Sequence, residues 1–349
     1  MHRKGHSRRN KAHSLISAEV QTLEARQMLS SVPVWISPAE VMALPTTGEA
    51  WTTLVTEAKK TGDSPKISDQ NSNSDVRTLA RALVGVRLND PVLIARAMSD
   101  ISNAMGTEKG ARTLAVGRNL PSYVAAAGVL NLADRNPALD AKFRTWLVSF
   151  KTQKFDGETL AQTHERRPNN WGTHAGAARI AAALYLGDGA ELARAVTVFR
   201  GWLGDRGAYS GFEWGDRSWQ SDPTKPVGIN PKGATLKGHN VDGVLPDDQR
   251  RAGSFRYPFP KENYVYEALQ GAIVQAELLY KAGYTTVYSW SDQALLRAYR
   301  WLNDQAKYPA EGDDRWQMSI VNKRYGTTLP AYSKANAGKN MGWTAWTHR

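Results

Sequence analysis

The chain has 349 residues, of which 41% are hydrophobic, so it is long enough to bury one large core or two medium ones. It contains no cysteine, which excludes disulfides, thiolate chemistry and cysteine zinc sites. No apolar run approaches the ~18–20 residues that a membrane span needs, so we expect no membrane partner.

The formal net charge of +12 suits a polyanionic partner, such as nucleic acid, anionic lipid or acidic polysaccharide. Residues 1–32 carry +4 of this charge and the rest of the chain carries +8. The twelve tryptophans favour a polysaccharide, because flat aromatic faces stack on sugar rings. No recognised nucleic-acid-binding motif is present, so we expect no nucleic acid as partner.

Residues 1–32 are predicted to lie apart from a single folded domain at 33–349. They are basic and polar, and they lack the apolar stretch of an ordinary secretory signal. The segment "LEARQMLS" resembles the Leu-Glu-x-Arg-x-x-Leu-Ser element near the start of many exported planctomycete proteins. This resemblance implies export to the periplasm or the extracellular space. A disordered basic tail is the alternative.

Helical signals dominate after residue 45. Apolar residues recur at helical spacing in 73–88, after Asn73 or Ser74 as a cap, and Asp90–Pro91 is a common helix opening. Strand-like alternation is scarce, and short breaks such as 186–191 favour antiparallel packing of consecutive helices. The predicted helices are 48–60, 73–88, 90–105, 108–133, 137–151, 171–186, 189–204, 262–282, 288–306 and 312–320.

About ten paired helices predict an all-α fold, either an α/α toroid (complete or incomplete) around a cleft or a multi-bundle arrangement. The exception is 205–261, which is rich in Gly, Pro, Trp and charge. An irregular connection of that length inside a compact domain is usually functional.

The stretch "RRPNNWGTHAGAARIAAALYLGD" (166–188) opens an apolar helix with an unusual number of polar groups. Asn169 or Asn170 can cap this helix, and its free amides and positive dipole end favour an anion. His174 follows Asn170 by four residues and so shares its helix face. Arg166 and Arg167 precede this start, and Gly172 and Gly176 leave room for close approach. The alternative is a capped helix whose His174 belongs to the core.

The second polar cluster lies at 239–279. It has a turn at Asp242–Gly243, a stretch with three arginines, and a helix with two tyrosines in its first turn. Cations beside a tyrosine stabilise its phenolate, as a tyrosine base requires. The alternative is that the tyrosines are core aromatics and the arginines a solvated face. The residues are Arg250, Arg251, Arg256, Tyr264 and Tyr266.

These motifs resemble those of the alginate lyase superfamily. "GVLPDDQRR…ENYVYEALQ" is similar to its Gly-Phe-Leu-Pro-Asn-Glu-x-x-Arg…Tyr-His-x-Tyr-Ala-Leu segment, and "NNWGTH" to its Asn-Asn-His-x-x-Trp motif. Position by position, the neutralising asparagine, the arginine and the catalytic tyrosine of that family fall on Asn170, Arg251 and Tyr264.

Other family-like segments extend this resemblance discontinuously over about 36–345: "ISPAEVMALPTTGEAW", "SDQNSNSDVRTLARALV" and "RTLAVGRNLPSYVAAAGVL". Together they provide candidates for substrate binding in the cleft wall. The binding candidates are Asn71, Arg118, Asn119, Tyr123, Asn169, Trp171, His239, Arg250 and Tyr266.

Two departures from the family pattern concern the carboxylate-neutralising group. Trp171 stands where alginate-specific members have histidine, with His174 one turn later as the catalytic candidate and His239 as a second. The loop between Arg251 and Tyr264 is also longer than in those members. Both departures concern the identity of the sugar more than the type of reaction.

The resemblance implies β-elimination across a 1,4-linked uronic acid, as in alginate or glucuronan. Asn170, Arg251 and a histidine would neutralise the carboxylate, and Tyr264 would act as base and acid, with no metal or other cofactor. One alternative is a glycoside hydrolase on the same type of toroid, using loop aspartates. Those aspartates are Asp242, Asp247 and Asp248, which as turn residues would more often be solvated. A non-catalytic polysaccharide-binding protein is the other alternative.

Overall fold

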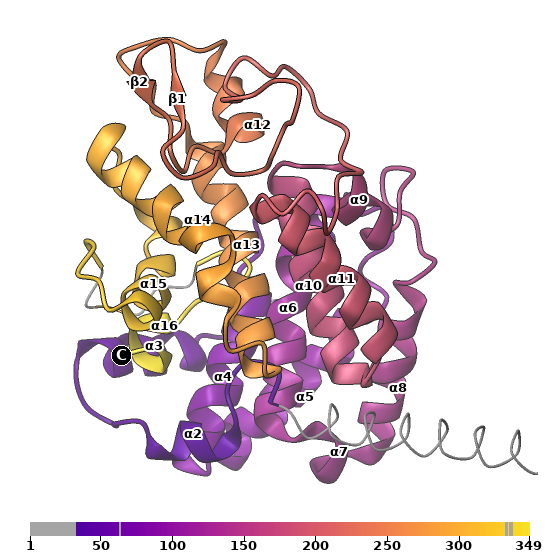
Figure 1. Ribbon diagram of the computed structural model, residues 1–349. Helices are drawn as coiled ribbons and strands as arrows, with labels where there is room; N and C mark the ends of the chain where they lie inside the picture. Colours follow the sequence, from indigo (N-terminus) through magenta and orange to yellow (C-terminus); the bar gives the residue numbers. More distant parts are fainter. Residues whose placement is uncertain (1–32, 63, 332–333, 335–337) are drawn as a thin grey trace, which may run out of the picture.

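The computed structural model describes residues 33–62, 64–331, 334 and 338–349, and this part of the chain is mostly helical (Figure 1). The predicted export segment, 1–32, lies outside the described residues. Within the described ranges, no helix is long and apolar enough to cross a membrane.

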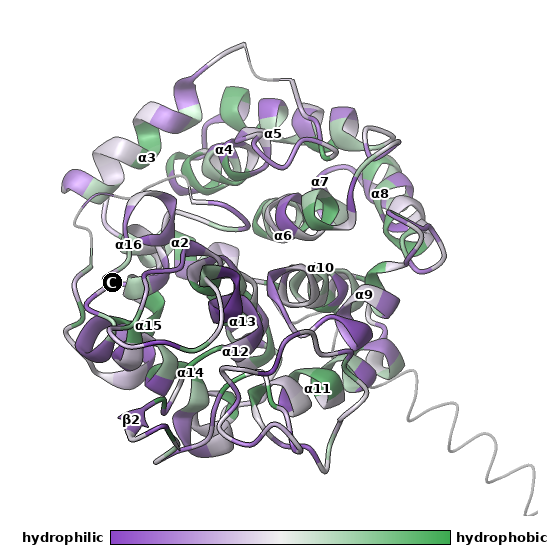
Figure 2. Cartoon of the chain, turned by 90° about the horizontal axis from the view of Figure 1, so that it is seen from above, coloured by the Kyte–Doolittle hydropathy of each residue, from purple (hydrophilic) through white to green (hydrophobic). Residues whose placement is uncertain are grey.

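Two rows of helices alternate along the chain, an inner row and an outer row (Figure 2). Neighbouring inner helices pack against one another, in the order α4, α6, α10, α13. The inner helices are α4 (Ser74–Leu88), α6 (Thr113–Leu130), α10 (Asn170–Leu186) and α13 (Asn263–Lys281). The outer helices are α3 (Glu49–Lys59), α5 (Pro91–Ala104), α8 (Pro137–Ser149), α11 (Gly189–Leu203) and α14 (Trp290–Arg300).

Shorter elements complete the fold. Contacts from α13 to α15, from α15 to α16 and from α16 to α3 connect the end of the series to its start, consistent with the predicted all-α toroid. The helical ones are α2 (Pro38–Ala43), α7 (Leu132–Arg135), α9 (Leu160–Arg166), α12 (Pro246–Gln249), α15 (Gln317–Tyr325), α16 (Thr344–Thr347), the 3₁₀ turns η1 (Arg250–Ala252), η2 (Val287–Ser289) and η4 (Gly312–Asp314), and the π-helical η3 (Trp301–Gln305). The strands β1 (Thr235–Leu236) and β2 (His239–Asn240) form an antiparallel hairpin.

Most of the predicted helices are confirmed to within a few residues. The helix predicted at 312–320 begins later, since α15 starts at Gln317, and the short helices α2, α9, α12 and α16 were not predicted. The segment 205–261 is largely irregular, as predicted, and its regular structure is limited to the hairpin, α12 and η1.

Glycines let the inner helices approach closely. A Cβ atom at Gly117 of α6 would lie 2.9 Å from the carbonyl carbon of His174 in α10. A Cβ atom at Gly271 of α13 would lie 2.5 Å from the backbone nitrogen of the same His174. The room that Gly172 and Gly176 leave is likewise filled by the protein itself. A Cβ atom at Gly172 would clash with the carbonyl oxygen of Arg167, and one at Gly176 would clash with side chains of α9 and α13. These glycines therefore serve packing rather than a ligand.

Candidate functional site

A cleft of about 560 Å³ lies at the N-terminal ends of the inner helices. The first turns of α6, α10 and α13 contribute to it, together with the loop before α4, η1 and the C-terminal segment. Its lining residues are Gln70, Asn71, Arg112, Leu114, Arg118, Arg167, Asn169, Asn170, Trp171, Arg251, Asn263, Tyr264, Glu267 and Lys339.

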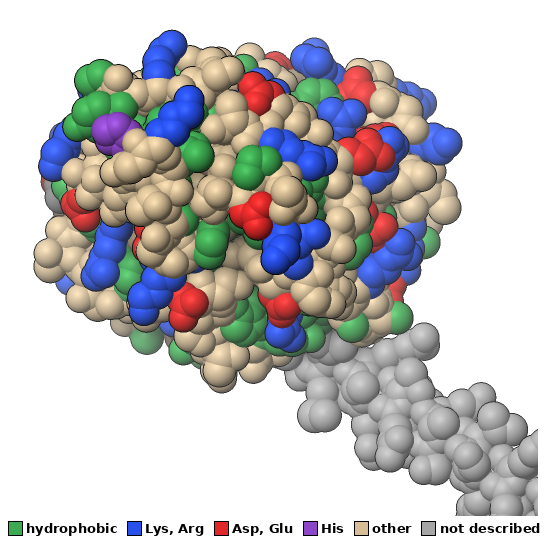
Figure 3. All heavy atoms as spheres, turned by 45° about the horizontal axis from the view of Figure 1, so that its top comes forward, with side chains coloured by type: hydrophobic (Ala, Val, Ile, Leu, Met, Phe, Trp, Pro, Cys, Tyr) green, Lys and Arg blue, Asp and Glu red, His purple; other side chains and the backbone are tan. Residues whose placement is uncertain are grey.

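The cleft is strongly cationic. Among the lining residues that the structure describes, Glu267 is the one carboxylate, and it forms an ion pair with Arg118. Helix N-termini carry partial positive charge, so three of them add to the attraction for an anion. Lys and Arg side chains are also spread over the face of the molecule drawn in Figure 3. The cationic lining residues are Arg112, Arg118, Arg167, Arg251 and Lys339.

The start of α10 presents a free amide to this cleft. Asn169 is the helix cap, and its side chain accepts a hydrogen bond from the backbone N–H of Trp171 at 3.1 Å. The backbone N–H of Asn170 donates to the Asp248 carboxylate at 3.1 Å, which fixes the first turn. The Asn170 side chain is only 1% exposed, and neither of its amide atoms has a partner within the described residues. A buried amide without a partner is costly, so it marks a place where a ligand can bind.

Tyr264 and Arg251 lie together in the same cleft. The Tyr264 side chain is 42% exposed, and the guanidinium carbon of Arg251 lies 3.9 Å from the centroid of its ring. Glu262 caps α13 by accepting a hydrogen bond from the backbone N–H of Tyr264 at 3.0 Å. The loop that the sequence analysis treated as a source of positive charge thus stacks an arginine directly on the candidate base.

Trp171 takes part in a second aromatic–cation contact. The guanidinium carbons of Arg112 and Arg167 lie 5.2 and 4.8 Å from the centroid of its ring. Elsewhere in the cleft lining, Asn71 of the loop before α4 accepts a hydrogen bond from Lys339 of the C-terminal segment at 3.4 Å.

His174 does not line the cleft, and this corrects the sequence analysis. Its side chain is fully buried, and its Nδ1 lies 3.0 Å from the amide nitrogen of Asn340. Burial lowers the pKa of His174 well below its usual value, and the nearby charges of Arg118 and Lys339 lower it further. The ring is therefore neutral and cannot supply the positive charge expected of it.

Two more candidates from the α6 segment lie outside the cleft lining. The Asn119 amide donates to the carbonyl oxygens of Ile67 at 3.0 Å and Asp69 at 2.9 Å, so it holds the loop that carries Asn71. Tyr123 is fully buried, and its hydroxyl is hydrogen-bonded to Ser74 at 3.0 Å.

Three candidates from the second polar cluster also lie outside the lining. Tyr266 is fully buried and donates its hydroxyl to the carbonyl of Tyr308 at 2.8 Å. Arg250, from the loop before this helix, forms an ion pair with Asp247 at 2.9 Å. His239 stacks on Tyr257, with ring centroids 4.0 Å apart.

The aspartates of the hydrolase alternative have structural partners instead. Asp242 pairs with Arg297 at 2.5 Å. Asp247 and Asp248 are buried, against the expectation that they would be solvated. Burial raises the pKa of Asp248 well above its usual value, and the charge of Asp247 adds to this rise. None of the three lines the cleft.

Several lining residues were not assigned from the sequence. Glu267 follows Tyr264 by three residues in α13, so helical spacing from the candidate base could have found it, whereas Asn263 is the adjacent residue and helical spacing does not indicate it. No local signal connects Lys339 to the cleft, because it arrives from the C-terminal segment. The unassigned residues are Gln70, Arg112, Leu114, Arg167, Asn263, Glu267 and Lys339.

Comparison with known proteins gives one family. Residues 114–208 match the model of the family described as alginate lyase. The match spans α6 to α11 and includes Arg118 and the Asn169–Trp171 start of α10, whereas Arg251 and Tyr264 lie beyond it. No curated protein matches the chain. Over residues 114–208 the chain is thus similar to the alginate lyase family, and the mostly helical fold agrees with this similarity.

Proposed function

We propose that the protein cleaves a 1,4-linked polyuronate, such as alginate or glucuronan, by β-elimination. One observation carries this proposal: three separate parts of the chain bring the free amide of Asn170, the guanidinium of Arg251 and the phenol of Tyr264 into one cationic cleft.

The first chemical task is to neutralise the uronate carboxylate, because the C5 proton is only weakly acidic beside a full negative charge. The amide of Asn170 would donate a hydrogen bond to the carboxylate, and Arg251 would supply positive charge as the transition state becomes enolate-like. Arg251 forms no ion pair among the described residues, although its charge acts on the buried carboxylate of Asp248, and its guanidinium lies in the cleft. His174, neutral and buried, has no part in this step.

The second task is proton transfer. Tyr264, as phenolate, would take the C5 proton; the C5–H electrons form the C4=C5 double bond, and the bond from C4 to the glycosidic oxygen breaks. The phenol would then return the proton to the leaving oxygen. The guanidinium of Arg251 lies stacked on the Tyr264 ring, next to the group that transfers the proton.

A hydrolase needs two carboxyl groups around the bond that is cleaved. The lining of the cleft has one, Glu267, which is paired with Arg118. The elimination mechanism is thus better supported than hydrolysis. We further propose that residues 33–349 form a single lyase domain and that residues 1–32 direct export.

The test is ultraviolet absorbance of the unsaturated uronate, with alginate blocks, glucuronan, pectate and hyaluronan offered in parallel. Tyr264→Phe should reduce turnover by about 10²–10⁴-fold, because it removes the acid–base group. Tyr257→Phe is the matched control, since Tyr257 is 61% exposed and lies outside the cleft lining. Saturated reducing ends would instead establish hydrolysis, and binding without turnover would establish a binding protein.

A further inference from the structure

Trp171, Arg112 and Arg167 form a second cationic group within the cleft. Trp171 directly follows Asn170, Arg112 immediately precedes α6, and Arg167 immediately follows α9. The two guanidinium carbons lie 5.2 and 4.8 Å from the centroid of the Trp171 ring, so the ring orients both cations. We call these three residues the Trp171 group.

The charges of this group are only partly balanced by the protein. Arg167 pairs with Glu158 at 3.1 Å, but Glu158 also pairs with Arg166 at 2.6 Å. Arg112 is exposed. Within the described part of the chain, its guanidinium contacts the ring of Trp171 and forms no ion pair. A guanidinium has five N–H donors in a planar fork that matches a carboxylate. The donors of Arg112 are therefore open to an anion.

The position of the group beside Asn170 determines which anion it meets. Asn170 and Trp171 are consecutive residues in the first turn of α10. A sugar whose carboxylate lies at Asn170 therefore has a neighbouring sugar of the same chain near Trp171. The N-terminal ends of α6 and α10 both lie there and favour negative charge. A neutral sugar at this place offers Arg112 hydroxyl acceptors but no negative charge, so it offsets the desolvation of the guanidinium less well than a carboxylate does.

We propose that Arg112, Trp171 and Arg167 form a subsite for the carboxylate of the uronate adjacent to the one that reacts. This inference rests on the proposed function for the position of the reacting sugar. It assigns the residues by which the cleft distinguishes a chain of contiguous uronates, as in the proposed substrates, from a polymer in which uronates alternate with neutral sugars. The arginines then act as specificity-determining residues, and the ring of Trp171 holds their orientation.

The experiment measures binding by calorimetry in full-length protein that carries Tyr264→Phe, so that turnover plays no part. The probes are a tetramer of contiguous uronates and a hyaluronan tetrasaccharide, in which every second sugar is neutral. The parent should bind the contiguous tetramer more tightly. Adding Arg112→Gln should reduce the ratio of the two dissociation constants, hyaluronan tetrasaccharide over contiguous tetramer, by about tenfold, as expected for the loss of one charge-assisted contact.

Arg200→Gln is the matched control. Arg200 also lies over a tryptophan, with its guanidinium carbon 5.7 Å from the Trp290 ring centroid, but it belongs to α11 outside the cleft lining. An unchanged difference in Arg112→Gln would overturn the inference, as would an equal narrowing in Arg200→Gln. Because the readout is binding, a dependence on Arg112 in a protein without lyase activity would retain the subsite while rejecting the proposed reaction.

Discussion

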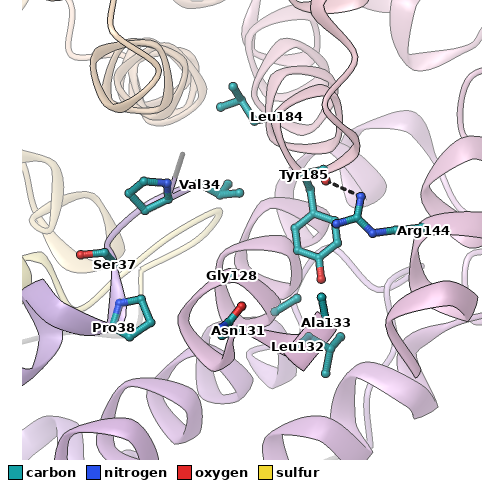
Figure 4. Close-up of a pocket in the computed structure, with 12 residues that line it drawn as sticks. Val34, Ser37, Pro38, Gly128, Asn131, Leu132, Ala133, Arg144, Leu184 and Tyr185 are labelled. Carbon is teal, nitrogen blue, oxygen red and sulfur yellow. Dashed lines mark hydrogen bonds between the residues drawn. The ribbon is translucent and has the colours of Figure 1, made fainter. Parts of the chain in front are cut away.

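The inner helices α6 and α10 begin at the cationic cleft and end beside another cavity, of about 290 Å³ (Figure 4). Asn131, Arg144 and Tyr185 are among the residues that line this second cavity. Here the polar groups are occupied by the protein: Arg144 donates to the carbonyl of Tyr185 at 2.9 Å and to Asp140 at 2.7 Å. The helix ends that meet there are C-terminal and carry partial negative charge.

The cleft differs from this cavity in both respects. Its helix ends are N-terminal, and the amide of Asn170 and the donors of Arg112 lack protein partners in the described chain. The cleft is also the larger of the two, about 560 Å³ against about 290 Å³, but volume does not indicate the charge of a ligand. The polarity of the helix ends and the supply of unpaired donors do separate them, and both favour an anion in the cleft. We therefore expect substitutions at the cleft end to change turnover and substitutions at the far end to change stability.

The largest effect is expected from Glu277→Gln, in the last turns of α13. Burial alone would raise the pKa of Glu277, but contacts with His348 and Arg324 outweigh it and hold the pKa well below its usual range. The substitution leaves Arg324 and His348 without their buried anion and should lower the free energy of unfolding by about 3–5 kcal/mol. Denaturant titration measures the loss, and turnover per folded molecule should not change.

The pH dependence gives a check on this interpretation. An acid with a lowered pKa stabilises the fold above its unfolded pKa, and this contribution disappears as the pH falls through the folded value. The difference between wild type and Glu277→Gln should thus be largest near neutral pH and shrink in acid. A constant difference across pH would show that the ion pair is not its cause.

The next effect is expected from Asn170→Ala, at the cleft end. Turnover should fall by about a hundredfold, because the variant loses a donor to the developing negative charge. Stability should stay equal or rise slightly, since the lost amide has no protein partner. Steady-state kinetics and thermal unfolding measure both quantities.

Asn131→Ala is the matched variant at the far end of α6. Asn131 ends the helix in the left-handed conformation, with φ of 51°, and its amide bonds to Asp134. Alanine there should lower stability by about 1–2 kcal/mol without changing turnover. An equal loss of turnover in both variants would contradict the division between the two ends.

Local signals in the sequence predicted the starts of α10 and α13 to within one residue, whereas α6 begins at Thr113 rather than at 108. Asn169 caps α10 as predicted, and Gly187 ends the helix in the left-handed conformation; both features act within one turn. The grouping of Asn170, Arg251 and Tyr264 in one cleft came from the family resemblance rather than from periodicity. A seven-residue helix such as α9 is too short to give a clear pattern.

The rest depended on contacts between distant parts of the chain. His174 does share a helix face with Asn170, but Asn340 covers its ring, and no pattern near residue 174 indicates this. Lys339 reaches the cleft through a tight turn at Gly338, which has φ of +46° and no space for a Cβ atom. Residues joined in this way can be found only when the fold is known.

The last comparison is a pH dependence at the cleft end, where a buried acid with a raised pKa contrasts with Glu277. Asp314 of η4 accepts a hydrogen bond from the Gln270 amide at 2.7 Å, and burial raises its pKa to about 7. Between its unfolded pKa and about pH 7, the folded state keeps a proton that the unfolded state has lost. This group therefore destabilises the fold increasingly as the pH rises, by up to about 1.4 kcal/mol per pH unit, and the effect levels off above its folded pKa.

Asp314→Asn keeps the shape and the acceptor of the protonated acid but cannot ionise. Its stability relative to wild type should be equal near pH 4 and higher at pH 8, opposite in sign to the behaviour of Glu277→Gln. Thermal unfolding across this pH range in both variants makes the comparison. If Asp314→Asn instead lost stability toward high pH, the carboxylate would be paired with Arg118 or Lys339 in the folded state, and the cleft end would resemble the far end in satisfying its own charges.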